Sequence, residues 1–476
     1  MQLDRGTGPL STRWPGPVHR SKLLVALHRG GASLHAQLEA QLRDGVRDGR
    51  LAPGTRLPSS RTLAAELGVS RGVVVEAYAQ LAAEGYLRVR PGAAPVVGAV
   101  PAGGAAAPAQ PPAAPPRHDL RPGLPDLSAF PRADWGRALR RALREIPDAE
   151  LGYPDPAGHP RLRAALAAYL GRVRGVRASP ERIIVCGGVA EALRLTASVL
   201  RARGVTMVAV EDPSHAETQG QLAFGGLEPV PVPVDEQGLD VRAIPPAAGA
   251  ALVTPAHHFP SGVVMAPERR AALVAWSQDT GGLVVEDDYD AEHRYDRAPV
   301  GAVQGLAPDH VVFVHSVSKT LAPALRLGWA VAPARLAGAL AEAKRRSDLG
   351  TPVLEQLALA DLIERGDLDR HLRRVRPRYR RRRDALVGAL LAGRDDLAVE
   401  GVAAGLHVAV RLPAHVAEED VVAAAAARGV AVGTVGQHAV APRPAALVLG
   451  YARLPEAGLR AAARALLAAI ADAAPA

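Results

Sequence analysis

From about residue 118 to the C-terminus, short apolar runs alternate with longer segments whose apolar residues recur at helical spacing. The runs are rich in Val, Ile and Leu and end at turn residues or polar groups, which is typical of strands buried beneath helices. They read RIIVCGG, TMVAVED, ALVTP, GLVVEDD, HVVFVHS and LGWAVAP. The pattern therefore predicts an α/β layer fold with buried parallel strands over residues 118–476.

Residues 33–97 have the pattern of a small helical unit that ends in strand-like pieces. A first amphipathic helix is predicted by apolar residues at helical spacing, namely Leu34, Leu38, Leu42 and Val46. Two shorter helices follow, with Gly68 allowing a tight turn between them and Ser70 capping the second. The segment YLRVRPGAAPVV then reads as two strands joined at Pro91 and Gly92. Two helices joined by a short glycine turn indicate a helix-turn-helix, whose second helix enters the DNA major groove.

The segment AVPAGGAAAPAQPPAAPP, residues 99–116, separates these two regions. It has six prolines and no apolar periodicity, so it cannot bury a core and reads as an extended tether. A chain of 476 residues is also too long to fold around one ordinary hydrophobic core, and it suggests two to four domains. The predicted organisation is a DNA-binding domain at 20–97, a Pro/Ala-rich linker at 98–117, and an α/β domain at 118–476 with a smaller C-terminal α/β subdomain from about 350 to 476.

The net charge of +9 is unevenly placed along the chain. Residues 1–95 hold 13 Lys and Arg against 7 Asp and Glu, a surplus of six. This asymmetry favours an N-terminal unit that faces a polyanion. A basic solvated surface on an arginine-rich chain explains the same count.

Composition also bears on the compartment. The single cysteine, Cys186, excludes an internal disulfide framework and fits a reducing environment. No run of eighteen apolar residues indicates a membrane span, and the N-terminus lacks the apolar core of a signal peptide. We therefore expect a cytoplasmic protein with no membrane partner.

Lysine is rare in this chain: 57 residues are Lys or Arg, and only three of them are lysine. Lys319 follows a fully apolar run, beside Ser316 and Ser318 and seven residues before Arg326. Arginine stays protonated, whereas a desolvated lysine can lose its proton and attack a carbonyl to form a Schiff base. Two hydroxyls and a guanidinium beside that amine can clamp a phosphate. An aldehyde together with a phosphate points to pyridoxal 5′-phosphate (PLP), although most lysines are surface charges.

Other predicted strand ends offer groups that this cofactor needs. Asp287 ends the run GLVVEDD and suits the pyridine nitrogen, which a buried carboxylate keeps protonated. Tyr289 suits the phenolic oxygen of the ring, and His215 in EDPSHAE suits a face of the pyridine. The run IVCGG leads into a helix that begins near Val189, and its first amides suit a phosphate. All these groups lie at the carboxyl ends of strands, where α/β sheets bind ligands.

The N-terminal motif PSSR…LGVSR…GY resembles the GntR-type winged helix-turn-helix over about sixty residues. By this resemblance Arg61, Ser70 and Arg71 stand at phosphate- or base-contacting positions, and Gly92 stands at the tip of the wing. Guanidinium groups and helix N-terminal amides suit phosphate, and arginine also reads guanine. The wing departs from the family's Gly-Ser-Gly with Gly92-Ala93-Ala94. The resemblance implies double-stranded operator DNA as a partner.

The segment from about 118 to 476 resembles a fold-type I aminotransferase, and the whole chain resembles the MocR subfamily of GntR regulators. The matching motifs are RPGLPDLSAFPRADW, YPDPAGHPRLRAALAAYL, VEDP, TPAHHFPSG, EDDYDAEHRY and SVSKTLAPALRLG. The resemblance implies a PLP-dependent transferase-like domain of three layers, α/β/α, with a smaller C-terminal subdomain. It also implies a homodimer with sites at the subunit interface, where Tyr153 from one subunit contributes to the site of the other.

Carried over by position, Lys319 forms the Schiff base with PLP and Asp287 pairs with the pyridine nitrogen. His258 lies in the turn near the ring. The predicted cofactor-binding residues are Gly188, Val189, Ala190, His215, His258, Asp287, Tyr289, Ser316, Ser318, Lys319 and Arg326. We predict no metal site.

Several positions depart from the family pattern. The family's Ser, Gln, Tyr and Asn are replaced here by Val189, Ala190, His215 and Phe259. The catalytic relatives carry an arginine for the substrate's α-carboxylate in a late strand, where this chain reads LVLGY with Val448. A valine cannot bind a carboxylate. Arg443 and Arg453 are the nearby alternatives, but their spacing puts neither in the same place.

Two functions from different classes follow. The first is a transcriptional regulator that senses PLP or its imine with an amine effector, and so controls vitamin B6 or amino-acid metabolism. The missing carboxylate arginine favours PLP itself as the effector, with a γ-aminobutyrate analogue as the competitor. The second is a working PLP-dependent aminotransferase with an accessory DNA-binding domain. Val448, Phe259 and the apolar phosphate loop favour the regulator. A regulator whose pocket binds little PLP is a third possibility, kept open by Val189, Ala190 and His215.

Overall fold

The computed structural model describes residues 19–20, 25–28, 31–90, 92–99, 115–295 and 300–474. The chain divides into two compact units, Met1–Ala113 and Ala114–Ala476. Most of the predicted linker at 98–117, and Pro91 of the predicted wing turn, lie outside the described residues. In the part of the chain that the structure describes, no helix is both long and apolar enough for a transmembrane span.

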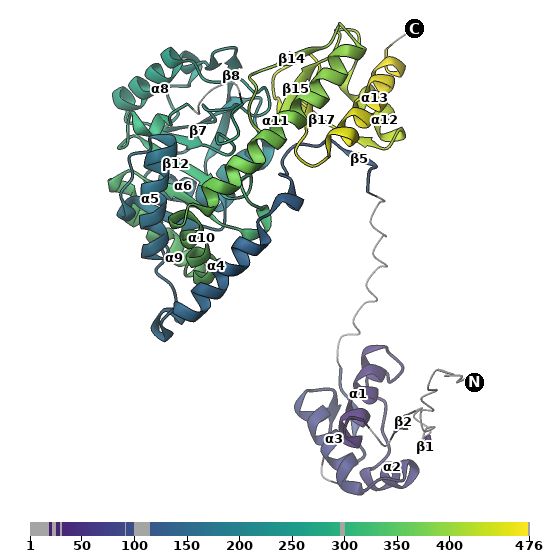
Figure 1. The fold of residues 1–476 in the computed structure, drawn as a ribbon. Helices are drawn as coiled ribbons and strands as arrows, with labels where there is room; N and C mark the ends of the chain where they lie inside the picture. The colour runs from purple at the N-terminus through teal and green to yellow at the C-terminus, as the bar shows by residue number, and fades with distance from the viewer. Residues whose placement is uncertain are drawn as a thin grey trace, which may run out of the picture. The chain divides into compact units, whose positions relative to one another are not determined.

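The N-terminal unit is a helical bundle (Figure 1), to which a two-stranded wing is attached. Its elements are α1 (Leu34–Arg47), α2 (Ser60–Leu67), α3 (Arg71–Ala83) and the antiparallel pair β3 (Leu87–Arg88) and β4 (Val96–Val97). A further antiparallel pair, β1 (His19–Arg20) and β2 (Ala26–Leu27), precedes α1 and was not predicted. The core is formed by Leu38 and Leu42 of α1 against Val74, Tyr78 and Leu81 of α3, all at most 4% exposed. The predicted apolar stripes are therefore confirmed.

Two turns explain how α2 and α3 are joined. Ser59 caps α2, because its Oγ accepts a hydrogen bond from the Thr62 amide at 3.2 Å. Gly68 ends α2 with a φ of 64°, a conformation that glycine adopts without strain. Ser70 stands at the N-cap of α3, but its side chain makes no capping hydrogen bond. The Val73 amide bonds to the carbonyl of Ser70 instead, so the predicted side-chain cap is wrong.

The second unit is built on a mixed sheet of eight strands in the order β6-β13-β12-β11-β10-β7-β8-β9. The strands are β6 (Ile183–Cys186), β7 (Met207–Asp212), β8 (Glu228–Asp235), β9 (Gly238–Leu239), β10 (Ala250–Val253), β11 (Leu283–Asp287), β12 (Val311–Ser316) and β13 (Gly328–Val331). Strands β12, β11, β10 and β7 run parallel, as the apolar runs predicted. Strand β8, which was not among those runs, is parallel to β7.

Strand β13 corrects one part of that prediction, because it runs antiparallel to both of its neighbours, β12 and β6. The residues between β12 and β13 form a short loop with one 3-10 turn and no crossover helix. A parallel connection needs a dozen or more residues, usually including a helix, to carry the chain back across the sheet. The run LGWAVAP is as apolar as its neighbours because β13 is buried on both faces of the sheet. This burial does not depend on the direction in which the strand runs.

Alternate residues of the strands pack against helices on opposite faces, so the unit has three layers. On one face, Ile184 and Cys186 pack with α6 (Val189–Ala202), α7 (Ala216–Phe224) and α9 (Ala334–Asp348). On the other face, Ile183 and Val185 pack with α5 (Pro160–Arg174) and α10 (Val353–Glu364). Helix α8 (Pro267–Thr280) covers the β10–β11 part of that face, and α4 (Arg132–Glu145) packs on α10. The predicted α/β/α architecture is confirmed.

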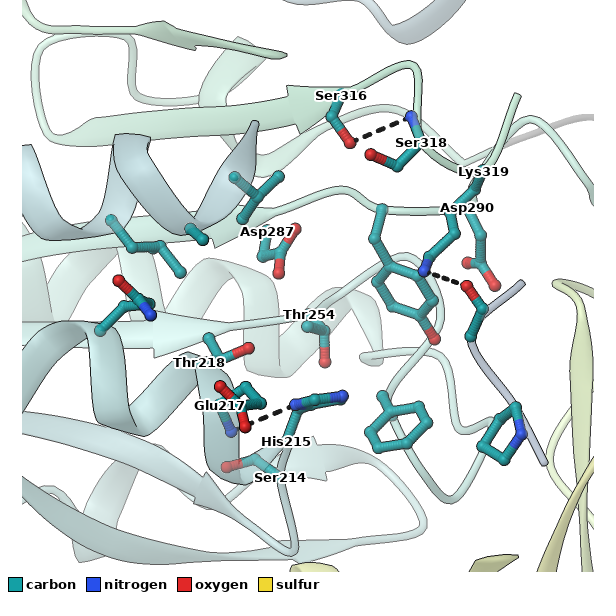
Figure 2. A pocket seen from close by; sticks show the side chains of 18 of the residues that line it. Ser214, His215, Glu217, Thr218, Thr254, Asp287, Asp290, Ser316, Ser318 and Lys319 are labelled. Carbon is teal, nitrogen blue, oxygen red and sulfur yellow. Dashed lines mark hydrogen bonds between the residues drawn. The ribbon is translucent and has the colours of Figure 1, made fainter. Parts of the chain in front are cut away.

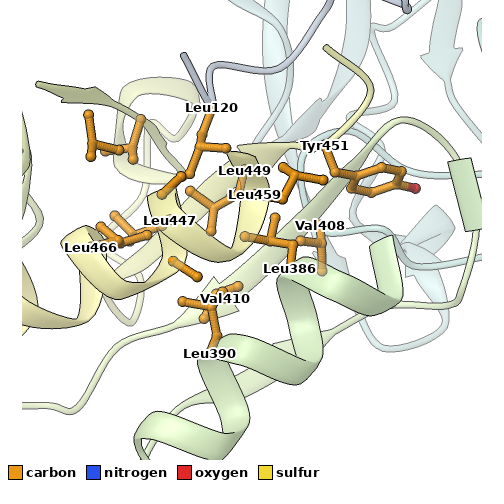
Figure 3. Packing of buried hydrophobic residues seen from close by; sticks show 14 of the residues in the cluster. Leu120, Leu386, Leu390, Val408, Val410, Leu447, Leu449, Tyr451, Leu459 and Leu466 are labelled. Carbon is orange, nitrogen blue, oxygen red and sulfur yellow. The ribbon is translucent and has the colours of Figure 1, made fainter. Parts of the chain in front are cut away.

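A smaller subdomain follows, and Figure 3 shows its core. Its antiparallel sheet has the order β14-β15-β18-β17, formed by β14 (Ala398–Glu400), β15 (His407–Arg411), β18 (Ala446–Gly450) and β17 (Gly433–Thr434). Its helices are α11 (Asp367–Gly393), α12 (Glu418–Ala427) and α13 (Glu456–Asp472). Leu386 of α11 and Leu459 of α13 meet Val408 and Leu449 of the sheet in this core.

The first strand of the second unit belongs to this subdomain rather than to the large sheet. Strand β5 (His118–Asp119) pairs in parallel with β16 (Val430–Ala431). Leu120, which follows β5, is fully buried in the core of the subdomain. The small subdomain therefore also includes the stretch that directly follows the linker, whereas α10, which lies within the subdomain predicted from about residue 350, packs on the large sheet.

Candidate functional site

A cavity of about 290 Å³ lies at the carboxyl ends of β7, β10, β11 and β12 and the start of α6 (Figure 2). Nine of the predicted cofactor residues line it: Val189, Ala190, His215, Asp287, Tyr289, Ser316, Ser318, Lys319 and Arg326. The structure therefore brings together side chains that lie on five separate segments of the sequence. Gly188 and His258 are the two predicted residues that do not line the cavity.

Lys319 lies in the loop that follows β12, with its amine in the cavity. Its Nζ donates a hydrogen bond to the carbonyl of Gly123 at 2.5 Å. Burial lowers the pKa of Lys319, and the carboxylates of Asp290 and Asp287 partly oppose this effect. A lowered pKa makes the neutral, nucleophilic amine easier to reach, which suits attack on a carbonyl.

Asp287 ends β11 and points into the middle of the cavity (Figure 2). Its Oδ1 is buried and has no hydrogen-bond partner among the residues that the structure describes. Burial, together with the neighbouring Asp288, raises the pKa of Asp287 to about 7. A buried acceptor without a donor is costly unless a ligand completes it. A protonated ring nitrogen is such a donor, so Asp287 fits the pyridinium of PLP.

The start of α6 faces the guanidinium of Arg326. Gly188 caps the helix with a φ of 110°, and the first amides of the helix, at Val189 and Ala190, have no acceptor within the helix. A β-carbon at Gly188 would lie 3.3 Å from Nη2 of Arg326, so glycine provides the space as well as the backbone conformation. Free amides at a helix N-terminus beside a guanidinium suit a phosphate group.

Two hydroxyls complete this anion-binding corner. The Oγ of Ser316 accepts the amide of Ser318 at 3.3 Å, which orders the loop between β12 and Lys319. Arg326 has no ion-pair partner among the described residues, and it is held in the left-handed region at a φ of 49°. A non-glycine residue in that conformation is uncommon and is found mainly where the surrounding structure fixes it. The guanidinium is therefore available to a ligand.

Tyr289 reaches the cavity from the loop after β11. Its hydroxyl lies 3.2 Å from Nδ1 of His257, and burial raises the pKa of the phenol well above its usual value. The phenol therefore keeps its proton at neutral pH and can donate a hydrogen bond to an oxygen of a bound ring. His257 was not predicted, although it stands in the quoted motif TPAHHFPSG.

The two predicted histidines have different environments. His215 caps α7, because its Nδ1 accepts the amide of Glu217 at 3.2 Å, and its exposed ring lies at the cavity wall. His258 is only 2% exposed and lies behind the wall. Its Nδ1 is 2.7 Å from Oγ of Ser261, and its Nε2 is 3.1 Å from the carbonyl of Pro213. Both nitrogens are engaged there, so the structure does not bring His258 to the cavity.

The structure places both alternative carboxylate-binding arginines, Arg443 and Arg453, outside the cavity lining. Val448 is fully buried in an apolar cluster against Phe259. Arg443 donates to a backbone carbonyl of β8 at 2.7 Å, and Arg453 pairs with Asp119 at 2.5 Å. Neither guanidinium lines the cavity. Among the described residues, neither of these arginines therefore replaces the carboxylate-binding arginine that the resemblance led us to expect.

Several polar residues of the cavity wall were missed by the sequence reasoning: Glu211, Ser214, Thr218, Thr254, Asp290 and His407. Glu211 and Asp290 end or follow apolar runs, so the rule that sheet ends bind ligands would have found them. His407 comes from the small subdomain, far along the chain from Arg326, the last of the predicted cofactor residues, and no spacing signals it.

The buried carboxyl of Glu211 should make the free energy of unfolding depend on pH. Burial raises the pKa of Glu211 to about 8 from its ordinary value of 4.5, although Thr254 donates to its Oε2 from both Oγ1 and the backbone. Between those two pH values the folded protein holds a proton that the unfolded chain has lost. The free energy of unfolding should therefore fall as pH rises from 7 to 8, by up to about 1.4 kcal/mol per pH unit from this group.

Glu211→Gln should flatten that slope, because glutamine keeps an acceptor for Thr254 but does not titrate. Denaturant unfolding of the second unit at pH 7.0, 7.5 and 8.0 measures it. Glu228→Gln, at an exposed carboxyl on β8, is the matched control and should leave the slope unchanged. An equal slope in Glu211→Gln and the wild type would show that this carboxyl is already ionised at pH 7.

The predicted DNA-contacting residues all belong to the helix-turn-helix or its wing. Arg61 is in the first turn of α2, and Ser70 and Arg71 stand at the start of α3. Gly92 lies in the turn between β3 and β4 with a φ of 77°. All four residues are exposed. The unit therefore presents two arginines and a helix N-terminus on its surface, the groups that contact phosphate and base edges.

Comparison with known proteins assigns both units. Residues 34–97 match the family model for bacterial regulatory proteins of the gntR family, and residues 126–466 match that for aminotransferase class I and II. The second unit is similar to the crystal structure of LysN, α-aminoadipate aminotransferase from Thermus thermophilus, complexed with N-(5′-phosphopyridoxyl)-L-leucine. That likeness has a TM-score of 0.67 and 27% identity, and it covers 74% of this chain and 92% of LysN. The fold is thus that of a PLP-dependent family.

Two curated relatives match over both units. The probable rhizopine catabolism regulatory protein MocR of Rhizobium meliloti is 34% identical over 455 residues, 90% of this chain and 92% of that protein. The HTH-type pyridoxine biosynthesis transcriptional regulator PdxR of Corynebacterium glutamicum is 35% identical over 395 residues, 79% of this chain and 82% of that protein. The chain therefore belongs to the MocR subfamily of GntR transcriptional regulators, in which a helix-turn-helix unit precedes a domain of the aminotransferase fold.

Proposed function

We propose that this regulator binds PLP through Lys319 and that the bound cofactor changes its affinity for operator DNA. The observation that carries the proposal is the orphaned Oδ1 of Asp287, which lies in the same cavity as the amine of Lys319. Arg326 and the start of α6, which line the same cavity, offer a guanidinium and free amides to a phosphate. When bound, PLP supplies an aldehyde that links to the lysine amine. The residues present therefore fit the group that the fold family uses.

The effector that best suits this cavity is PLP itself rather than an amino acid. An amino acid brings an α-carboxylate, and the described lining offers Arg326 as its arginine, beside the helix N-terminus that suits the phosphate. Phe259 lines the cavity with an apolar ring, and the fully buried Val448 packs behind it. A carboxylate placed there would lose its hydration without gaining a cation, which costs several kcal/mol. The match to a relative named for pyridoxine biosynthesis supports the same choice.

The same wall argues against aminotransferase activity. Catalysis requires that the substrate be held in one orientation, and a bidentate arginine usually provides this for a carboxylate. Without it, an amine that reaches Lys319 lacks a second anchor. We therefore expect no steady turnover of an amino acid with a keto acid. Sustained turnover would favour the enzyme with an accessory DNA-binding unit.

We further propose that the chain acts in the cytoplasm as a homodimer. Several large apolar side chains near the N-terminal part of the second unit are exposed, Tyr153 at 89% and Leu151 at 62% among them. A monomer rarely leaves such groups together in water, so a second copy is a suitable cover. Light scattering on the purified full chain measures the oligomeric state. A monomer at micromolar concentration would contradict it.

The experiment that tests the function is a DNA titration of the full chain with and without PLP. DNA from the region upstream of its own gene is the probe. PLP should change the affinity by at least about fivefold, the usual lower bound for coupled sites. Pyridoxamine 5′-phosphate, which lacks the aldehyde, is the matched control ligand and should have a smaller effect. Equal DNA affinity in all three conditions, with PLP visibly bound, would contradict the coupling.

Arg71→Ala should weaken operator binding by about 1–3 kcal/mol if the guanidinium reads a base edge. A uniform loss across DNA sequences would instead identify a phosphate contact. Fluorescence anisotropy with operator and scrambled duplexes separates the two cases. Arg50→Ala, at an exposed arginine of the same unit, is the control for charge alone. An unchanged affinity in Arg71→Ala would remove this residue from the interface.

A further inference from the structure

We propose that His257, Asp290 and His407 form a binding site for a divalent transition-metal cation of the zinc class. The residues come from the loop after β10, the loop after β11 and the first position of β15. Their exposed fractions are 2%, 1% and 4%. One nitrogen or oxygen from each lies within 4.8 Å of the others. Two imidazoles and one carboxylate are a ligand set that zinc and ferrous iron both accept.

The donor atoms of His257 and Asp290 have the spacing of two ligands of one metal ion. Nδ1 of His257 lies 3.1 Å from both carboxylate oxygens of Asp290. Zinc bonds of about 2.0–2.2 Å in a tetrahedron put ligand atoms about 3.3 Å apart, close to this spacing. Nε2 of His407 faces the carbonyl of Pro260 at 3.2 Å, so Nε2 carries the ring proton and Nδ1 keeps its lone pair. The rings of His257 and His407 are 4.9 Å apart between centroids.

The charge of Asp290 also calls for a cation. Its carboxylate is buried, and its ion-pair partner is His257. Among the described residues, no ion pair of 4.0 Å or less joins Asp290 to a lysine or an arginine, and Lys319 interacts with this carboxylate from a greater distance. A buried carboxylate is normally paired with a charged group or bound to a metal. A divalent cation between His257, Asp290 and His407 would neutralise this charge and replace the contact between the first two with bonds to the metal.

The backbone is shaped to let these groups meet. A β-carbon at Gly405 would overlap the ring of His257 and a carboxylate oxygen of Asp290. Glycine at this position, with a φ of 70°, lets the strand that carries His407 approach the other two residues. The hydroxyls of Tyr295 and Tyr451 both donate to the carbonyl of Gly405, at 2.6 and 2.7 Å, and hold it there.

The site opens on the cavity, because Asp290 and His407 both line it. Three protein ligands leave one position open in a four-coordinate zinc site, and a ligand in the cavity can fill it. The hydroxyl of Tyr289 lies 3.2 Å from Nδ1 of His257, at the edge of the site. The inference departs from the sequence prediction of no metal site. The three residues are scattered over 150 positions, so no ligand spacing is visible in the sequence.

Zinc titration of the full chain tests the site. Protein prepared without a histidine tag is treated with EDTA, dialysed and titrated with ZnCl₂ by calorimetry, in the absence of PLP. We expect one high-affinity Zn²⁺ per chain. His407→Asn and Asp290→Asn should each weaken it at least tenfold, since loss of even an outer-shell partner costs about 10–100-fold. His438→Asn, at a nearby partly exposed histidine outside the cluster, should leave it unchanged.

Two results would overturn the proposal: no stoichiometric uptake by the wild type, or equal affinity in His407→Asn and His438→Asn. If a variant fails to fold, Co²⁺ added to the wild type decides, since four-coordinate nitrogen and oxygen ligation gives intense visible bands. A weak, hexa-aquo-like spectrum would overturn the site. PLP binding is read separately from its own absorption, so a failure of either proposal leaves the other result intact.

Discussion

Lys319→Ala is expected to abolish the visible absorption that PLP acquires when it is added to the wild-type chain. The amine is the group that links to the aldehyde, and an alanine offers nothing in its place. The fold should survive, because the side chain of Lys319 makes one hydrogen bond among the described residues, to Gly123, and belongs to no apolar cluster there. Absorption spectra before and after PLP addition measure the band. Borohydride reduction and peptide mapping then locate the pyridoxyl group.

Lys319→Arg is the matched control for charge. It keeps a cation and a donor near Gly123 but cannot form the Schiff base, so it too should lack the band. Circular dichroism establishes that both variants are folded. A band that persists in either variant, or a pyridoxyl group mapped to another lysine, would show that the anchor is assigned to the wrong residue.

Arg174→Met should destabilise the second unit by about 3–5 kcal/mol, because it leaves a buried carboxylate without its partner. Arg174 makes two hydrogen bonds to Asp288, at 2.7 and 2.8 Å, and neither side chain is more than 1% exposed. It also donates to the carbonyl of Val300. Asp288 directly follows Asp287, so the loss should reach the cavity as well. An unpaired Asp288 would raise the pKa of Asp287 further.

Thermal and denaturant unfolding of the full chain measure this effect on the transition of the second unit. Arg172→Met is the control: its pair with Asp369 is largely exposed on the arginine side, so about 0–1 kcal/mol is expected. PLP affinity, measured by the visible band, should fall in Arg174→Met and stay constant in Arg172→Met. Similar stability in the two variants would mean that solvent compensates Asp288 after the substitution.

The sequence predicts much of this fold for identifiable reasons. The apolar runs of β7, β10, β11 and β12 are buried on both faces, so their composition alone marks them as central strands. Each run ends in the residues that line the cavity, and the sheet itself brings Asp287 and Lys319 to one edge. The helix-turn-helix can also be predicted from the sequence, because the glycine turn and the apolar stripes are local signals.

What the sequence does not show depends on contacts between distant segments. The direction of β13 follows from the length of a loop and not from its own composition. His258 is quoted in a motif beside the site, yet its side chain bonds to Pro213 and Ser261 behind the wall. His407 joins the cavity only because the small subdomain packs there. Side-chain direction and subdomain packing are settled by the tertiary structure, which no local pattern reports.

The pairing of β5 with β16 has a mechanical consequence. The chain that leaves the linker is fastened at once to the small subdomain, and four residues later Gly123 accepts the amine of Lys319. One short stretch thus anchors the start of the second unit and also accepts the hydrogen bond of the reactive amine. A ligand that draws the amine away from Gly123 breaks a contact only a few residues from this attachment point.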